Sequence, residues 1–198
     1  MQENTPSKGQ LVVVAAPSGA GKGTLLQRVR ERLPNSVVTV SATTRPPRPG
    51  ETHGVEYYFY APDAFDRLIE EAAFVEWAHV HGRRYGTLKS EIERLLKEDA
   101  IVILEVDVQG MRNIKQLYPQ TIAIFIMPPS MAELERRLVL RGVNTPEDMA
   151  IRLKNAETEL EARHEFDYIV VNDRIERATD ELIALIQGDK IEADTEIP

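Results

Sequence analysis

A glycine-rich segment with a lysine near its end is the clearest place in the sequence where residue types and spacing indicate chemistry. It reads Ala16-Pro17-Ser18-Gly19-Ala20-Gly21-Lys22-Gly23-Thr24. Glycines here allow backbone N–H groups to converge on a phosphate, and the N-terminus of a following helix adds its positive dipole end. Lys22 would reach the β and γ phosphates of a nucleotide as a point charge. Because a lysine at a helix start is unfavourable unless an anion offsets it, we interpret the segment as a phosphate site.

The segment departs at both ends from the strict phosphate-loop pattern, G-x-x-x-x-G-K-[ST]. Ala16 replaces the first glycine, and Gly23 stands where a metal-binding hydroxyl is expected. Thr24, one residue later, could supply a hydroxyl through water. An ordinary turn between a strand and a helix is the alternative. A phosphate site by itself indicates nucleotide binding but no particular reaction.

A second segment, from Ser41 to Glu51, carries Arg45 and Arg48 among three prolines. Such a stretch cannot form a regular helix, so it would hold two guanidinium groups in place at low entropy cost. The planar guanidinium fork suits a phosphate dianion. Farther along, Glu76 could accept two hydrogen bonds from a nucleobase, and nearby tyrosines could reach the phosphate. The alternative for Glu76 is a surface acid on an edge strand.

Acids and further arginines follow in the second half of the chain. Glu105 and Asp107 lie at the end of an apolar run, at the edge of the sheet where doubly wound folds bind ligands. An acid at this position orients Mg²⁺ and its water in nucleotide-binding proteins. Arg137 and Arg141 are four residues apart and so share one face of a helix. The alternative for the arginines is that they are solvated surface charges.

The elements that would position these residues alternate between strands and helices. Apolar runs of strand length are Leu11–Ala16, Val37–Val40, Ile101–Val106, Thr121–Met127 and Tyr168–Val171. Strands that are apolar on both faces are typical of a parallel sheet covered by helices. The sequence therefore predicts an α/β fold of three layers with a central, mainly parallel sheet.

Helix signals lie between these runs. A helix is predicted from about Gly23 to Leu33, and it ends before Pro34. Ser130 with Glu133 has the spacing of a capping box, and Thr145 followed by Pro146 offers an N-cap with proline at the first helical position. A further helix is indicated by apolar residues that share one face, namely Leu88, Ile92, Leu95 and Leu96.

One segment interrupts the alternation. Residues 43–87 contain short aromatic strands, Tyr57–Tyr60 and Phe74–Val80, around a short helix, which predicts a small mixed α/β insertion. Residues 1–42, 88–127 and 165–188 would form the core domain, and residues 128–164 a helical lid with flanking helices. The acidic end of the chain, residues 189–198, is predicted to be disordered.

Composition narrows the class of protein. The chain has 198 residues, 42% hydrophobic, and a formal net charge of −8. This length suits one core, and the negative charge argues against nucleic acid as a partner. There is no cysteine, no apolar leader and no run long enough to cross a membrane, so we expect a cytoplasmic protein with no membrane partner.

From about Leu11 to Leu185 the sequence resembles the guanylate kinases. The resemblance rests on the motifs A-P-S-G-A-G-K, S-x-T-T-R-x-x-R-x-G-E, H-G-x-x-Y-x-F, F-x-E-x-A, Y-G-T, E-V-D-x-Q-G, P-P-S and D-Y-x-V-V-N-D. Each motif is weak alone, but their order and spacing together are specific. The resemblance implies an ATP:GMP phosphotransferase with a P-loop fold, a GMP-binding insertion and a helical lid. Mg²⁺ would accompany ATP, and the protein would be a monomer or a homodimer.

The resemblance also implies roles for individual residues. It places ATP binding on Pro17, Ser18, Gly19, Ala20, Gly21, Lys22, Gly23, Thr24 and Asn172, and more weakly on Asp173. It places GMP binding on Ser41, Arg45, Arg48, Tyr57, Glu76, Tyr85, Thr87 and Glu105. The implied catalytic residues are Lys22, Arg45, Arg137, Arg141 and Arg152, and the implied metal residues, acting through water, are Thr24, Glu105 and Asp107. The family usually has aspartate at the position of Glu105.

Two other functions fit parts of the sequence. Gly23-Thr24 after the lysine resembles adenylate kinases, so another nucleoside monophosphate kinase is one alternative. Guanylate kinase-like scaffold domains that bind phosphopeptides are the other. Such domains usually lack an intact phosphate loop, whereas Lys22 and the lid arginines are present here.

Overall fold

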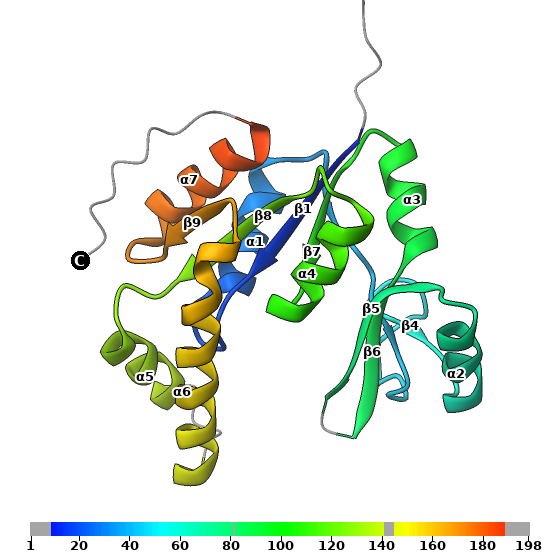
Figure 1. Ribbon diagram of the computed structural model, residues 1–198, viewed down its shortest axis with the longest axis horizontal. Helices are drawn as coiled ribbons and strands as arrows, with labels where there is room; N and C mark the ends of the chain where they lie inside the picture. Colours follow the sequence, from blue (N-terminus) through cyan, green and yellow to red (C-terminus); the bar gives the residue numbers. More distant parts are fainter. Residues whose placement is uncertain (1–8, 81, 141–144, 189–198) are drawn as a thin grey trace, which may run out of the picture. The chain divides into compact units, whose positions relative to one another are not determined.

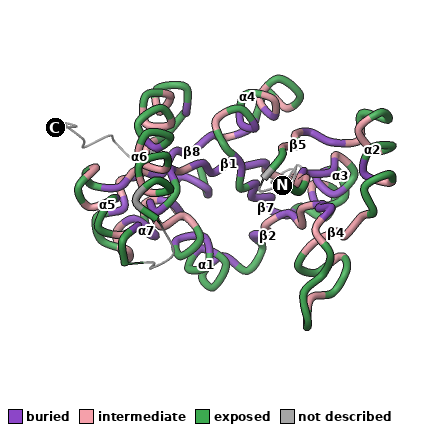
Figure 2. The backbone as a smooth tube through the Cα atoms, turned by 90° about the horizontal axis from the view of Figure 1, so that it is seen from below, coloured by how far each residue is buried: buried purple, intermediate pink, exposed green. Residues whose placement is uncertain are grey.

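The computed structural model describes residues 9–80, 82–140 and 145–188 (Figure 1). Its larger sheet has five strands in the order β2-β7-β1-β8-β9. The strands are β1 (Gln10–Ala15), β2 (Ser36–Val38), β7 (Ile101–Glu105), β8 (Ile122–Met127) and β9 (Tyr168–Val171). The pairs β2–β7 and β8–β9 are parallel. Figure 2 shows buried residues along the strands of this sheet. The predicted α/β fold with a mainly parallel central sheet is confirmed.

The smaller sheet is mixed and has the order β4-β3-β6-β5. Its strands are β3 (Ala42–Thr43), β4 (Tyr58–Phe59), β5 (Phe74–Val80) and β6 (Arg83–Leu88), with helix α2 (Pro62–Glu70) between β4 and β5. Strand β3 pairs in parallel with β4, whereas β6 is antiparallel to both β3 and β5. The sequence pattern predicts β4 and β5 but not β6.

The chain divides into two compact units. The first unit contains the residues up to Val13 and Ser36–Thr121, and the second contains Val14–Asn35 and the residues from Ile122 onward. The first unit holds α2, α3 (Lys89–Lys97) and α4 (Val108–Leu117). The second holds α1 (Lys22–Arg32), α5 (Met131–Leu140), α6 (Pro146–Glu161), the short 3₁₀ helix η1 (Ala162–Glu165) and α7 (Ile175–Gln187).

The core around the smaller sheet is built on an aromatic stack. Phe65 of α2 is fully buried, and its ring lies 4.5 Å from that of Phe74 between centroids. Ala42 and Leu88 complete the buried cluster. The guanidinium of Arg84 lies 5.1 Å from the centroid of the Phe65 ring and pairs with Asp66. These contacts hold α2 against the sheet.

Helices α5 and α6 lie side by side in the second unit (Figure 1) and pack through Leu134, Leu138 and Ala156. Both predicted N-caps are present. The Ser130 hydroxyl accepts the Glu133 N–H at 3.1 Å, and the Thr145 hydroxyl accepts the Asp148 N–H at 3.2 Å. Each such cap stabilises a helix start by about 1 kcal/mol.

Among the described residues, no helix combines the length and the apolar character that crossing a bilayer would require. The predicted disorder of residues 189–198 lies outside the described residues, as does His81.

Phe65→Ala tests the aromatic stack. The substitution leaves a cavity in a small core, so we expect the free energy of unfolding to fall by about 3–5 kcal/mol. Urea denaturation followed by circular dichroism measures this change. Leu117→Ala, at a side chain that is 49% exposed in the same unit, is the control and should cost less than about 1 kcal/mol. Equal losses for the two variants would contradict the packing role of Phe65.

Candidate active site

The phosphate loop joins β1 to α1, and two of its glycines adopt a backbone that other residues rarely take. Gly19 has φ +96° and Gly21 has φ +93°. A Cβ on Gly19 would lie 2.9 Å from the Leu138 side chain, and one on Gly21 would lie 2.4 Å from Asn172 Nδ2. Glycine is therefore required at both positions for conformation and for space. Nothing lies within 4 Å of a Cβ on Gly23, so no packing contact requires glycine there.

The carbonyl of Ala20 anchors this loop. It accepts a hydrogen bond from Asn172 Nδ2 at 2.7 Å and one from Arg137 Nη1 at 3.2 Å. Arg137 Nη2 also donates to the Asn172 carbonyl at 2.9 Å. The Asn172 side chain is buried, so its contact with the loop is shielded from water. Asn172 and Arg137 thus contact the backbone of the loop that they were expected to assist.

A carboxylate fixes Arg137 in turn. Glu133 Oε1 accepts from Arg137 Nε at 2.8 Å, and both Glu133 oxygens accept from Arg136 at 2.7 Å. The hydrogen bonds from Arg136 and then Arg137 lower the pKa of Glu133 to about 2. Instead of reaching back as a capping-box partner, this carboxylate holds two arginines. Arg136 is exposed and pairs with Glu133.

Other residues expected at ATP lie around the same loop. Arg152 Nη1 donates to Ser18 Oγ at 3.1 Å. Lys22 is the first residue of α1, and the first turn of that helix contains no acid. Gly23 and Thr24 are exposed there, whereas Pro17 and Ala20 are buried. Asp173, assigned more weakly, pairs with Arg177 at 2.8 Å. Arg141 lies outside the described residues.

The first unit contains a second cationic cluster, around Arg45. Its guanidinium carbon lies 5.3 Å from the ring centroid of Tyr57 and 5.6 Å from that of Phe59. The Tyr57 and Tyr85 rings meet edge to face at 5.9 Å. A hydrogen bond that Arg45 donates to Glu51, and a smaller effect of Tyr85, raise the pKa of Arg45, with burial opposing them. The structure thus brings Arg45, Tyr57 and Tyr85 together, while Arg48 is exposed in the same loop.

The residues expected to read a base lie on adjacent strands. Glu76 on β5 is opposite Thr87 on β6, and Thr87 Oγ1 donates to Glu76 Oε1 at 2.7 Å. Ser41 directly precedes Ala42 of β3, and Ala42 is opposite Gly86, the residue before Thr87. Because a hydroxyl has one hydrogen, Thr87 must leave Glu76 before it can donate to a base oxygen.

Burial controls the charge of Glu76. It raises the pKa of the carboxyl above the usual value, the Thr87 hydroxyl acts in the opposite direction, and the negative charge of Asp107 raises the pKa further. Asp107 therefore acts electrostatically on Glu76, a relation that the sequence does not reveal. A carboxylate poised in this way favours ligands that donate hydrogen bonds to it.

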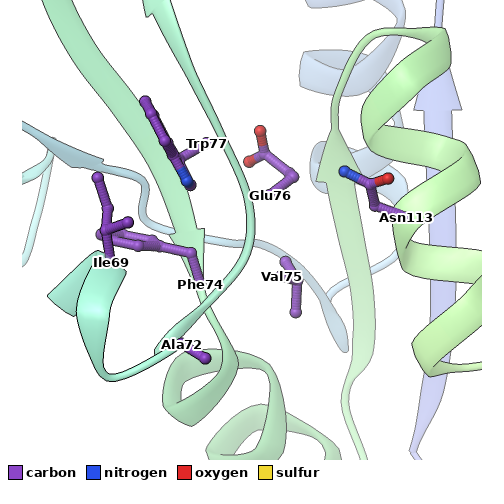
Figure 3. A pocket seen from close by; sticks show the side chains of 7 residues that line it. All are labelled: Ile69, Ala72, Phe74, Val75, Glu76, Trp77 and Asn113. Carbon is purple, nitrogen blue, oxygen red and sulfur yellow. The ribbon is translucent and has the colours of Figure 1, made fainter.

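A cavity of about 310 Å³ lies beside Glu76 (Figure 3). It is lined by Ile69, Ala72, Phe74, Val75, Glu76, Trp77 and Asn113. Asn113 Oδ1 accepts from Gln109 Nε2 at 3.1 Å. The volume is at the lower end of the range for small-molecule sites.

The residues expected at Mg²⁺ supply oxygen only. Glu105 is exposed at the end of β7, and Asp107 caps α4 by accepting the Gly110 N–H at 2.7 Å. Thr24 belongs to the other unit. Within the described ranges there is no group of three or more His, Cys, Asp or Glu that could hold a metal. A small number of oxygen ligands from the protein is enough for Mg²⁺, because this ion usually keeps several waters and binds substrate phosphates.

A glycine loop between a buried strand and a helix, beside a mainly parallel sheet, is typical of a P-loop α/β protein. Comparison with known proteins agrees with this class. The family model described as guanylate kinase matches residues 8–189. The chain belongs to the guanylate kinase family.

Individual relatives match almost the whole chain. It is 49% identical to a guanylate kinase of Thermosynechococcus vestitus over 185 residues, 93% of this chain and 95% of that protein. It is 46% identical to a guanylate kinase of Polaromonas sp., over 92% of this chain and 89% of that protein. Among solved structures, a guanylate kinase of Anaplasma phagocytophilum matches with a TM-score of 0.69 and 31% identity. The match covers 94% of this chain and 89% of that one. A shikimate kinase of Bacteroides thetaiotaomicron, 15% identical with a TM-score of 0.50 and covering 90% and 98%, shares the fold alone.

Glu76→Gln tests the cost of the buried charge. Because the pKa of Glu76 is raised in the folded state, its contribution to stability is present below about pH 4.5 and is lost as the pH rises through the folded-state pKa. We therefore expect the substitution to make the free energy of unfolding at pH 8 larger by on the order of 1 kcal/mol, and this gain should shrink toward pH 4.5. Glu70→Gln, at an exposed position of α2, is the control. A gain that does not depend on pH would contradict this explanation.

Proposed function

We propose that the chain transfers the γ-phosphoryl group of ATP to GMP and releases ADP and GDP. The observation that carries the proposal is the paired site of the first unit, in which a cationic and tyrosine-rich cluster accompanies Glu76 and Thr87 on neighbouring strands. A phosphate loop alone would fit many nucleotide-binding proteins. A phosphate cluster beside a base-reading acid favours a nucleoside monophosphate as the acceptor.

On the ATP side, the backbone of residues 17–24 receives the phosphates and Lys22 neutralises the charge that shifts toward the β and γ oxygens. Asn172 and Arg137 act through the loop by holding the Ala20 carbonyl. Arg152 and Arg141 complete the positive surroundings of the triphosphate, the first from beside Ser18. Residues 128–164 then serve as the lid.

On the GMP side, Arg45, Arg48, Tyr57 and Tyr85 bind the phosphate. Glu76 accepts from N1–H and the 2-amino group of guanine, Ser41 assists at the same end of the sheet, and Thr87 donates to O6. Adenine lacks this pair of donors and would leave Glu76 buried and unpaired, at a cost of about 1–3 kcal/mol or more. Residues 43–87 thus form the acceptor subdomain, and residues 1–42, 88–127 and 165–188 form the core domain.

Mg²⁺ neutralises charge on the β and γ phosphate oxygens when it is bound, and Thr24, Glu105 and Asp107 would hold it through water. Glu105 also adjoins the acceptor site in this proposal. The two acids and the hydroxyl supply the oxygen ligands that this ion prefers.

The reaction requires positioning more than covalent help from the protein. An oxygen of the GMP phosphate forms a bond to the γ phosphorus while the bond from that phosphorus to the bridging oxygen of ADP breaks. No general base is needed because the acceptor phosphate is already ionised. Arg45 orients that phosphate, and exclusion of water would prevent loss of the phosphoryl group to hydrolysis. The cytoplasm remains the expected compartment, and a monomer or homodimer the expected state.

A non-catalytic module that binds phosphopeptides would not need the lysine and the two positive-φ glycines of the phosphate loop. The relatives that span the chain bear the name of the enzyme, which favours catalysis.

Lys22→Met tests the phosphate loop. Loss of this charge should lower kcat by at least about 100-fold, because charge stabilisation is a large part of phosphoryl-transfer catalysis. ADP release in a coupled assay measures kcat, and circular dichroism checks folding. Lys97→Met, an exposed position on α3, should leave kcat within about twofold. Near-normal turnover of the Lys22 variant would dismiss the proposed role.

Acceptor selection tests the base-reading pair. With ATP and Mg²⁺ at saturation, the unmutated chain should use GMP at least about 100-fold better than AMP, UMP or dTMP, judged by kcat/KM. Glu76→Gln should reduce kcat/KM for GMP and leave KM for ATP within about twofold. Equal use of GMP and AMP by the unmutated chain would refute the guanine assignment.

A further inference from the structure

Glu51 lies at the end of the arginine loop and contacts both arginines of the phosphate cluster. Its Oε1 accepts from Arg45 Nη2 at 2.8 Å, and its Oε2 accepts from the backbone N–H of Arg48 at 2.7 Å. The side chains of Arg45 and Glu51 are only 14% and 17% exposed. A single carboxylate thus ties the side chain of one arginine to the backbone of the other.

The surrounding backbone explains why such a tie is needed. The loop lies outside the strands of the smaller sheet, and its prolines carry no N–H. The Glu51 N–H donates to the Arg48 carbonyl at 3.0 Å. Pro49 and Gly50 occupy the two central positions of this turn, and Gly50 has φ +90°, as a type II turn requires. Glu51 therefore closes the turn with its backbone and its side chain together.

The contacts of Arg45 leave it able to bind a ligand. Besides Glu51, its Nη1 donates to the Pro46 carbonyl at 2.9 Å, and its own N–H donates to Thr43 Oγ1 at 3.1 Å. A guanidinium has five N–H donors, so these two side-chain bonds do not exhaust it. The hydrogen bond from Arg45, and then the Arg48 N–H, hold the pKa of Glu51 below its usual value, so the carboxylate stays charged.

Glu51 has two opposing effects on a bound phosphate. Its negative charge repels a dianion, and its hydrogen bonds remove the entropy cost of ordering a long arginine side chain at the moment of binding. The Glu51 carboxylate contacts the side chain of Arg45 and the backbone N–H of Arg48. It therefore fixes the guanidinium of Arg45 relative to the backbone of Arg48.

We infer that Glu51 is a positioning residue for the acceptor phosphate, which orders Arg45 and the Arg48 turn so that both arginines meet one phosphate group. The inference rests on the proposed function, because it assigns this cluster to the GMP phosphate. Replacing Glu51 distinguishes positioning from competition by whether phosphate binding becomes weaker or stronger. If Glu51 positions the arginines, its loss weakens phosphate binding, and if it mainly competes with phosphate, its loss strengthens that binding.

The experiment compares Glu51→Gln with Glu56→Gln. Glu56 has the same charge in the next part of the chain, and its Oε2 accepts the Thr52 N–H at 2.7 Å. For Glu51→Gln we expect KM for GMP to rise about tenfold while KM for ATP and kcat change by less than about threefold, because a ground-state contact is lost. Glu56→Gln should stay within about twofold of the unmutated chain. Glu51→Asp, which keeps the charge on a shorter side chain, should be intermediate.

Guanosine separates positioning of the phosphate cluster from general damage. It lacks the phosphate, so its inhibition constant against GMP should be the same for the unmutated chain and for Glu51→Gln. An unchanged or lower KM for GMP in Glu51→Gln, an equal rise in Glu56→Gln, or an equal loss of guanosine binding would overturn the inference. If the unmutated chain made no GDP, the proposed function would fail. Calorimetry of GMP against guanosine would then still test Glu51.

Discussion

A phosphate dianion binds well only where positive groups are already held in place, and both units of the chain hold an arginine side chain in this way. In each unit a carboxylate fixes a guanidinium group. Glu133 holds Arg137, which donates to the Ala20 carbonyl of the phosphate loop, and Glu51 holds Arg45. Such charge-assisted bonds order long side chains in advance, so less entropy is lost when a nucleotide binds.

The pair of Glu76 and Thr87 applies the same idea to an acid. Glu76 is partly buried, accepts one bond from Thr87 and lies in the field of Asp107, so its charge is costly without a ligand. A base that donates hydrogen bonds to this carboxylate relieves that cost, and one that cannot donate does not. Selectivity for guanine would thus come from a site that is unfavourable when empty.

Much of the framework could be predicted from the sequence because it depends on local patterns. The apolar run Tyr168–Val171 is β9 as observed, and the strand predicted at Leu11–Ala16 is β1 shifted by one residue. Strand β6 could not be predicted, since its residues Arg83–Thr87 carry charge and glycine, and its pairing depends on β3 and β5. Interactions between residues far apart in the sequence could not be predicted either. Examples are the hydrogen bond from Asn172 to the Ala20 carbonyl and the effect of the Asp107 charge on Glu76. Glu51 stands in a recognised motif, yet only the structure shows that both its oxygens bind the arginine loop.

In the proposed reaction, one phosphoryl group passes from the ATP site to the acceptor cluster. The most direct test of this transfer follows the label of γ-³²P ATP with the purified chain, Mg²⁺ and GMP. We expect the label to appear in GDP at the same rate as ADP forms, and ADP to form very slowly without GMP. Label that appears only in inorganic phosphate, or ADP release that does not depend on GMP, would contradict the proposed transfer.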